Sequence, residues 1–346
     1  MQRNGLFDTC VARLPSLAGK AVAITGSTSG TGYWCAVAAA MKGAAMIMLV
    51  NRNSVRAEDA LHAIRKYSSQ DTEVVHIPCD LASFSSVRAA AVQIAQKAVD
   101  HGGLSVLCNN AGIMGFPDER TEDGFDVQMQ TNHTSHFLLT KLLMGSLEAA
   151  AEKHGDARVV QHSSAVRYLL PLKLDERYFL RCEPGALGGD GLVLFANFVR
   201  YHMTKLANST FAMALHAKLA ARGSAIKSLV AEPGVADTQL TPGLLEATGR
   251  TSKLIRWLGS LLSRHLMQSA ADGATPLIAC CFSEAACSGD FLAPSRFLWG
   301  APSLTVQAGH AKFGLINASE RLTMSESGQD LLWKASETAI GEAWLV

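Results

Sequence analysis

Neither sign of charge dominates this sequence. Its 346 residues carry 31 Lys and Arg against 30 Asp and Glu, which gives a formal net charge of +1. Proteins that neutralise nucleic-acid phosphates need a surplus of basic residues, so we expect no nucleic-acid partner. The hydrophobic share of 48% is ordinary for a globular protein, and the length allows one large domain or two small ones.

Long apolar runs are also missing. No run approaches the roughly 18 residues that a membrane span requires. Residues 1–20 lack the basic-then-apolar order of a secretory signal, so we expect a cytoplasmic protein, with organelle import left open. Asn132, Asn208 and Asn317 match the glycosylation pattern Asn-x-Ser/Thr, and we interpret these matches as chance.

Cysteine pairs of the kind that bind zinc do not occur. None of the eight cysteines belongs to a Cys-x-x-Cys motif, and several stand in apolar runs, as Cys108 does. This usage is typical of buried free thiols in a reducing compartment. We therefore predict neither disulfides nor a metal site.

Short apolar runs alternate with helical stretches through most of the chain. Strands are expected at 21–25, 45–50, 73–77, 104–108, 158–161 and 226–230. Helices are expected over 32–42, 54–67, 84–99, 123–154 and 198–222. Apolar strands alternating with helices indicate a parallel sheet covered on both faces. Right-handed crossovers then give an α/β fold with a doubly wound parallel sheet of the Rossmann type.

One domain is expected over residues 15–294, since no linker divides it. Residues 167–197 insert a loop containing Gly and Pro, and residues 241–267 place Leu and Trp257 at helical spacing. Residues 295–346 are expected as a C-terminal extension without a clear motif.

A glycine-rich turn follows the first expected strand. Gly26, Gly30 and Gly32 lie where a dinucleotide-binding fold needs a tight turn, a close approach to a pyrophosphate and a helix start. We assign the turn to the cofactor site together with its hydroxyl residues, Ser27, Ser29 and Thr31.

The end of the second strand favours one cofactor. Enzymes that use NAD usually carry an acidic residue here to bind the ribose hydroxyls, but this sequence has Asn51 and Arg52. Asn51 would not repel a 2′-phosphate, and Arg52 would pair with it. NADP(H) is therefore expected over NAD(H). Later strand ends supply further expected contacts to adenine and ribose: Asp80, Leu81, Asn109, Ala111 and Gly112.

Tyr201 and Lys205 are the expected catalytic pair. Four residues apart on a helix, they share one face. To act as acid or base near neutrality, a phenol must lose roughly 3 units from its pKa of about 10, and a neighbouring ammonium acts in that direction.

Together these motifs resemble the short-chain dehydrogenase/reductases over about residues 17–294. The local sequence around Asn51, Asn132 and Tyr201 is similar to that of the retinol dehydrogenase, WW-domain oxidoreductase and protochlorophyllide reductase branch. The resemblance implies that Tyr201 donates or accepts the proton and that Lys205 lowers its pKa and holds the nicotinamide ribose. It implies that Ser164 binds the substrate oxygen and that Asn132 holds a water. The nicotinamide carboxamide would be fixed by Pro233, Gly234, Val235 and Thr238.

The resemblance also suggests a reaction. We expect hydride transfer between nicotinamide and the carbonyl or alcohol carbon of a small hydrophobic substrate, such as a retinoid, lipid or steroid. Residues 241–267 are expected as a lid over it, with a membrane-surface helix or a plain packing helix as alternatives. A C=C reductase of the protochlorophyllide type and a non-catalytic NADP-binding protein remain rival readings, and a homodimer is left open.

Two positions depart from the family pattern. The interval between Ser164 and Tyr201 is long, so the 167–197 insertion is expected to reshape the pocket. His162 stands just before the serine pair, where a small residue is usual, and we interpret it as a packed core histidine.

Overall fold

The apolar runs of the sequence form the strands of one central sheet. The computed structural model describes residues 5–168, 173–187, 196–234, 268–295, 300–307, 310–311 and 317–346. The strands that it shares with the expectation are β1 (Ala21–Thr25), β2 (Met46–Asn51), β3 (Glu73–Pro78), β4 (Leu104–Asn109), β5 (Ala157–His162) and β6 (Ile226–Ala231). Their neighbours all run parallel, which confirms the doubly wound fold. β1, β2, β4 and β5 are buried along their whole length because helices cover both faces.

Three further strands extend the sheet beyond β6. β7 (Phe291–Pro294) is parallel to β6, while β8 (Pro302–Gln307) and β9 (His310–Ala311) are antiparallel. Within the described residues the order is β3-β2-β1-β4-β5-β6-β7-β8-β9. These three strands lie outside the six that the apolar runs of the sequence predict. Residue 294 is the expected end of the domain, but β8, which follows it, pairs with β7, which precedes it. Residues after 294 therefore continue the same sheet.

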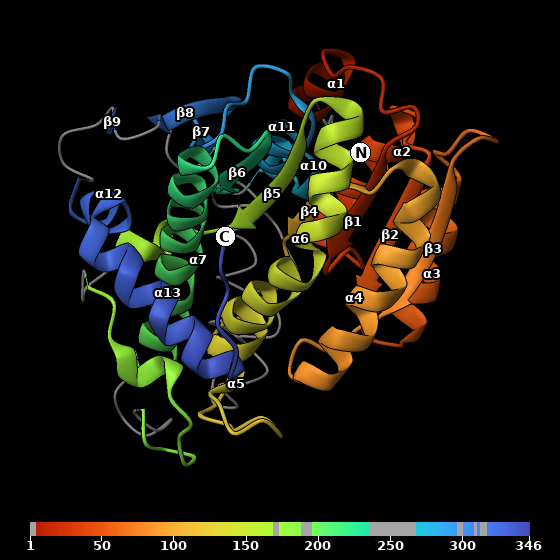
Figure 1. Cartoon of the computed structure of the whole chain (residues 1–346). Coiled ribbons are helices and arrows are strands. Elements are labelled where there is room, and N and C mark those ends of the chain that lie inside the picture. The colour runs from red at the N-terminus through yellow and green to blue at the C-terminus, as the bar shows by residue number, and fades with distance from the viewer. Residues whose placement is uncertain are drawn as a thin grey trace, which may run out of the picture.

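Helices form one layer on each side of the sheet (Figure 1). One face packs against α1 (Gly5–Ala12), α2 (Gly30–Met41), α3 (Val55–Arg65), α10 (Ala270–Gly273) and α11 (Thr275–Phe282). The other packs against α4 (Phe84–Ala98), α6 (Ser135–His154), α7 (Ala196–Ala221) and α13 (Glu326–Ile340). Neighbouring residues of β1 divide between the two cores, Val22 and Ile24 facing one and Ala21 and Ala23 the other, as the two-residue period of a strand requires.

The helix expected over residues 123–154 is wrong at its start. The chain instead forms a short α5 (Val127–Met129), then a π-helical turn η2 (Gln130–Thr134), and only then α6. Asp126 caps α5 by accepting the Met129 N–H at 2.8 Å, so helix begins after it. The π-turn contains Asn132, whose amide is bonded to a neighbouring loop rather than facing solvent. π-turns inside helices often occur at functional sites.

The C-terminal residues pack onto α6 and α7 (Figure 1). After α12 (Asn317–Met324), α13 brings Trp333 against Phe137 of α6 and Phe211 of α7, with ring centroids 5.2 and 6.1 Å apart. Trp344 stacks on Trp333 at 4.9 Å. Aromatic side chains of this size bury large apolar areas, so α13 and the residues after it belong to the main core.

Short 3-10 turns complete the described structure. They are η1 (Val99–His101), η3 (Ala165–Tyr168) and η4 (Glu176–Phe179). η4 lies in the 167–197 insertion, and its Tyr178 and Phe179 are buried in the core beside α13. That part of the insertion is therefore anchored to the fold.

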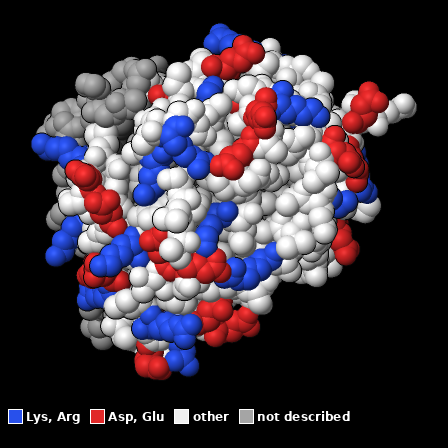
Figure 2. Space-filling model, viewed as in Figure 1, with Lys and Arg blue, Asp and Glu red and all other residues white. Residues whose placement is uncertain are grey.

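The surface carries charges of both signs. On the face drawn in Figure 2, acidic and basic side chains are interspersed over the helices without a continuous basic area. None of the helices in the described ranges combines the length and hydrophobicity needed to span a bilayer.

Candidate active site and cofactor site

The glycine turn lies between the carboxyl end of β1 and the start of α2. Gly26 and Gly30 have φ angles of 67° and 61°, a region that side-chain-bearing residues rarely adopt. A Cβ on Gly32 would lie 2.3 Å from Asn110 Nδ2 and 2.5 Å from the Gly26 carbonyl oxygen. The backbone therefore packs too tightly there for any side chain. A tight turn that opens a helix is the cradle that a pyrophosphate requires, so these residues fit a dinucleotide.

Asn51 holds the same turn from the end of β2. Its Oδ1 accepts the Ser27 N–H at 2.8 Å, and its Nδ2 donates to Ser27 Oγ at 3.0 Å. The side chain is thus buried and directed into the turn. Arg52 is exposed beside it and has no ion-pair partner in the described part of the chain. Of the two residues, Arg52 is the one available to an external phosphate.

Asn110, which the expected site did not include, connects the turn to β4. Its Nδ2 donates to the carbonyl oxygens of Thr25 and Gly26 at 2.8 and 3.1 Å, and its Oδ1 accepts from Thr31 Oγ1 at 2.8 Å. Asn109 points the other way and donates to Thr140 Oγ1 at 3.0 Å. The sequence shows two adjacent asparagines but not which of them faces the turn.

Other expected cofactor residues lie at neighbouring strand ends. Asp80 follows β3, and its Oδ1 accepts the Ala82 N–H at 2.9 Å. The Leu81 carbonyl accepts from Ser135 Oγ at 2.6 Å. The Ala111 N–H donates to Thr25 Oγ1 at 3.0 Å. Ser29 precedes α2 in extended conformation and makes no capping hydrogen bond with its side chain.

Tyr201, Lys205 and Ser164 meet at the carboxyl end of β5. The hydroxyl of Ser164 lies close enough to the side chain of Tyr201 to lower the pKa of the phenol. Lys205 Nζ lies 5.6 Å from the centre of the Tyr201 ring and donates to the His162 carbonyl oxygen at 2.9 Å. Helix α7 supplies the phenol and the ammonium, while the loop after β5 supplies the serine.

The pKa of Tyr201 differs from the expected direction. Burial raises it to about 12, with Glu232 raising it further and the Ser164 hydrogen bond lowering it. Burial also lowers the pKa of Lys205 to about 8. Removal from water disfavours the charged form of each group, and it is the largest cause of both shifts.

Asn132 lies within reach of this set through the π-turn. Its Oδ1 accepts the Ile113 N–H at 2.8 Å, and its Nδ2 donates to the Ile113 carbonyl at 2.9 Å and to Thr204 Oγ1 at 3.0 Å. A Cβ on Gly112 would lie 3.3 Å from Asn132 Oδ1 and 3.4 Å from Lys205 Nζ. Asn132 therefore joins the loop after β4 to helix α7.

A buried ion pair that the sequence did not reveal lies behind Ser164. Arg167 and Glu232 pair with side-chain exposures of 0% and 1%. Arg167 also donates to the Ser164 carbonyl at 3.3 Å, and its guanidinium lies 4.0 Å from the centre of the Phe291 ring. Glu232 precedes Pro233 and Gly234, so the pair links the serine loop to the segment expected at the nicotinamide.

Some expected residues lie outside the described ranges. Val235, Thr238 and the lid at 241–267 are among them. Gly234, which precedes them, has a φ of 65°, and the Pro233 carbonyl accepts from Gln268 Nε2 at 2.7 Å. His162 is buried, and its Nδ1 lies 3.3 Å from the Asn110 carbonyl oxygen.

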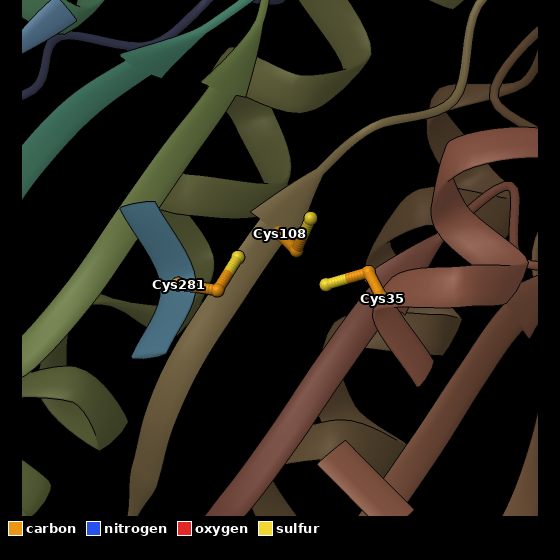
Figure 3. Close-up of side chains that lie close together, drawn as sticks. All are labelled: Cys35, Cys108 and Cys281. Carbon is orange, nitrogen blue, oxygen red and sulfur yellow. The ribbon is translucent and has the colours of Figure 1, made fainter. Parts of the chain in front are cut away.

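Three buried thiols lie close together on the face of the sheet that α2 and α11 cover. Cys35 of α2, Cys108 of β4 and Cys281 of α11 have sulfur atoms within 4.8 Å of one another (Figure 3). All eight cysteines are free. A structural zinc site takes four ligands, and among the described His, Cys, Asp and Glu residues only these three belong to the group. The cluster therefore packs as part of the core beneath α2.

Known proteins are similar to this chain in sequence. Residues 20–169 match the family model described as short chain dehydrogenase. Human polyprenol dehydrogenase is 34% identical over 68% of this chain, and the match spans 66% of that protein. Human retinol dehydrogenase 14 is 30% identical, with 93% of this chain and 87% of that protein covered.

Solved structures share the fold. An uncharacterized protein from Mycobacterium paratuberculosis superimposes with a TM-score of 0.68 at 27% identity, covering 97% of this chain and 98% of its own. A short chain dehydrogenase from Burkholderia cenocepacia in complex with NADP gives 0.57 at 22% identity, covering 81% and 97%. The family match, the relatives and the fold together show that this chain belongs to the short-chain dehydrogenases, in their retinol dehydrogenase-like branch.

Proposed function

We propose that the protein is an NADP(H)-dependent oxidoreductase that interconverts a carbonyl and an alcohol on a hydrophobic substrate. One observation carries the proposal: the buried side chains of Tyr201 and Lys205 lie beside Ser164 at the carboxyl edge of the sheet that also holds the glycine turn. In open parallel sheets, ligands bind outside this edge.

The cofactor would lie along residues that the described structure brings together. The glycine turn at Gly26, Gly30 and Gly32 would hold the pyrophosphate against the start of α2. Arg52, exposed beside the turn, would pair with a 2′-phosphate and so favour NADP(H). When bound, a nicotinamide supplies or accepts the hydride.

The side chains of this protein would handle the proton and the substrate oxygen. Because burial raises the pKa of Tyr201 to about 12, the phenol is protonated at neutral pH and suited to donate its proton to a carbonyl oxygen. Ser164 lies beside the same side chain and would orient the substrate oxygen there. Lys205, held by the His162 carbonyl, supplies positive charge near the phenolate that forms.

The substrate class is proposed from the relatives. Their names, polyprenol dehydrogenase and retinol dehydrogenase, refer to long apolar alcohols. We infer that this chain also takes an apolar chain or ring system with a terminal oxygen. The test is to screen purified protein with NADPH against prenyl, retinoid and fatty aldehydes and against short aldehydes, following cofactor absorbance.

The screen gives a clear decision. Turnover of the apolar aldehydes that disappears in Tyr201→Phe is the expected outcome. Turnover of short polar aldehydes alone would contradict the substrate class. Oxidation of NADPH that continues unchanged in Tyr201→Phe would contradict the proposed proton donor.

A further inference from the structure

A buried serine of the C-terminal helix α13 lies within hydrogen-bonding distance of His133, which is next to the expected site residue Asn132. Ser336 of α13 is fully buried, and its Oγ is 2.9 Å from Nε2 of His133 in the π-turn, across 203 residues of sequence. Asn132 precedes His133 directly and is part of the expected site. This contact is polar, unlike the aromatic packing that holds the rest of α13 in place.

The polarity of the contact follows from the chemistry of its partners. Burial lowers the pKa of His133 to about 3, so the ring is neutral and only one nitrogen carries a proton. Nδ1 lies 3.2 Å from Asn208 Oδ1, an oxygen that only accepts, so the proton is on Nδ1. Nε2 must then accept from the Ser336 hydroxyl. Ser336 is thus the donor that satisfies this buried nitrogen in the tautomer set by Asn208, and its loss would leave Nε2 without a partner.

The same logic continues to the catalytic lysine. With Asn208 Oδ1 facing His133, the amide is turned so that Nδ2 donates to the His162 carbonyl at 3.2 Å. That carbonyl is also the acceptor of Lys205 Nζ at 2.9 Å. If the amide turned over, its oxygen would face the carbonyl oxygen and the two would repel each other.

We propose that Ser336, His133 and Asn208 are positioning residues that orient the His162 carbonyl and, through it, the Lys205 ammonium. This role rests on the proposed function, in which Lys205 holds the nicotinamide ribose and supports Tyr201. The C-terminal helix would thus complete the active site, in addition to covering α6 and α7.

The first experiment removes only the hydroxyl. In Ser336→Ala we expect the dissociation constant of NADPH to rise and kcat to fall, each by about 3- to 10-fold, as for loss of one buried hydrogen bond. KM for the substrate should change little, because Ser336 lies far along the relay from the substrate oxygen. Ser327→Ala is the matched control, since Ser327 is an exposed serine of the same helix.

A double-mutant cycle distinguishes a relay from separate packing effects. His133→Phe keeps an aromatic ring next to Phe179 and Phe211, whose centroids lie 5.6 and 5.9 Å away, so we expect it to fold. If the serine acts through the histidine, Ser336→Ala adds no further loss of NADPH affinity in a His133→Phe background. Additive losses in the cycle would overturn the relay.

Two further outcomes are decisive. If Ser336→Ala only lowers thermal stability, while NADPH affinity and kcat match those of Ser327→Ala, the helix is structural and the proposal is wrong. If the wild-type protein binds NADPH but reduces none of the aldehydes, the proposed function fails. The binding arm of the cycle still decides the relay in that case, because it requires no turnover.

Discussion

At the scale of single residues, burial controls the chemistry of the proposed active site. Tyr201 and Lys205 are both buried. Burial raises the pKa of Tyr201 and lowers the pKa of Lys205, and each shift favours the neutral form. A neutral phenol is a proton donor at neutral pH. The lowered pKa of Lys205, about 8, lies close to neutral pH.

Tyr201→Phe should abolish turnover and leave NADPH affinity within about twofold, because the hydroxyl acts on the substrate oxygen. The measurement is a steady-state assay paired with a fluorescence titration of the cofactor. A loss of cofactor binding equal to the loss of turnover would show that the phenol serves the cofactor instead.

Lys205→Met should stabilise the fold at neutral pH by roughly 1–3 kcal/mol, since it removes a buried group whose charged form is disfavoured. The pKa of Lys205 is about 8 in the folded protein, against an ordinary value of 10.5 in the unfolded chain. The unfolded chain therefore binds more protons between those values, so wild-type stability rises with pH across that window. The advantage of the variant should shrink between pH 8 and 10 in urea unfolding. A constant advantage would mean that Lys205 titrates normally.

Arg52→Ala should weaken the binding of NADPH by about 1.5–3 kcal/mol and leave the binding of NADH nearly unchanged. Only NADPH has the 2′-phosphate that pairs with the guanidinium. Lys66→Ala is a suitable control. Arg52 precedes helix α3, and Lys66 is an exposed cation that directly follows the other end of that helix. Isothermal titration with both cofactors measures the difference. Equal losses for the two would remove Arg52 from the phosphate site.

At the scale of elements, the site depends on close contacts between strand ends and helix starts. Asn51 from β2 and Asn110 from beyond β4 hold the turn before α2 on both sides. Asn132 joins the π-turn to the loop after β4, and Arg167 joins the serine loop to the end of β6. Each element is locally ordinary, and the site arises where the elements meet.

Gly32→Ala tests the tightest of these contacts. The added Cβ would meet Asn110 and the Gly26 carbonyl at well below contact distance, so we expect NADPH affinity to fall more than tenfold and stability by about 1–3 kcal/mol. Gly145→Ala in α6 is the control, because its Cβ would meet no atom within 4 Å. Unchanged NADPH binding in Gly32→Ala would show that the turn does not approach the cofactor.

At the scale of the whole molecule, the residues after 294 complete both the sheet and the core. β8 extends the sheet, and α13 closes the face formed by α6 and α7. Glu342 strengthens this closure through ion pairs with Arg88 and Lys141. The fold of residues 15–294 thus shares its core with the C-terminal helices.

Trp344→Ala should lower the free energy of unfolding by about 3–5 kcal/mol, because it empties a buried aromatic site against Phe137 and Trp333. Leu345→Ala, at a position 97% exposed, should change stability by less than about 0.5 kcal/mol. Denaturant unfolding of both variants provides the comparison. Similar small effects would mean that the C-terminal residues contribute little to the core.

The sequence by itself determined the parallel part of the sheet and the family. Six strands lie within about a residue of where their apolar runs predicted them, because hydrophobic periodicity is a local signal. The glycine turn and the Tyr201–Lys205 spacing likewise depend on residues near one another in the chain. The relation to short-chain dehydrogenases followed from these local patterns, and the comparisons confirmed it.

Only the tertiary structure decided how side chains from distant segments face one another. Asn51 turns inward to Ser27, Arg167 pairs with Glu232, and Ser336 meets His133. The partners are up to 203 residues apart, and nothing in the local sequence marks them as a pair. The direction of the Tyr201 pKa shift also depends on burial, which follows from packing around the site rather than from the motif.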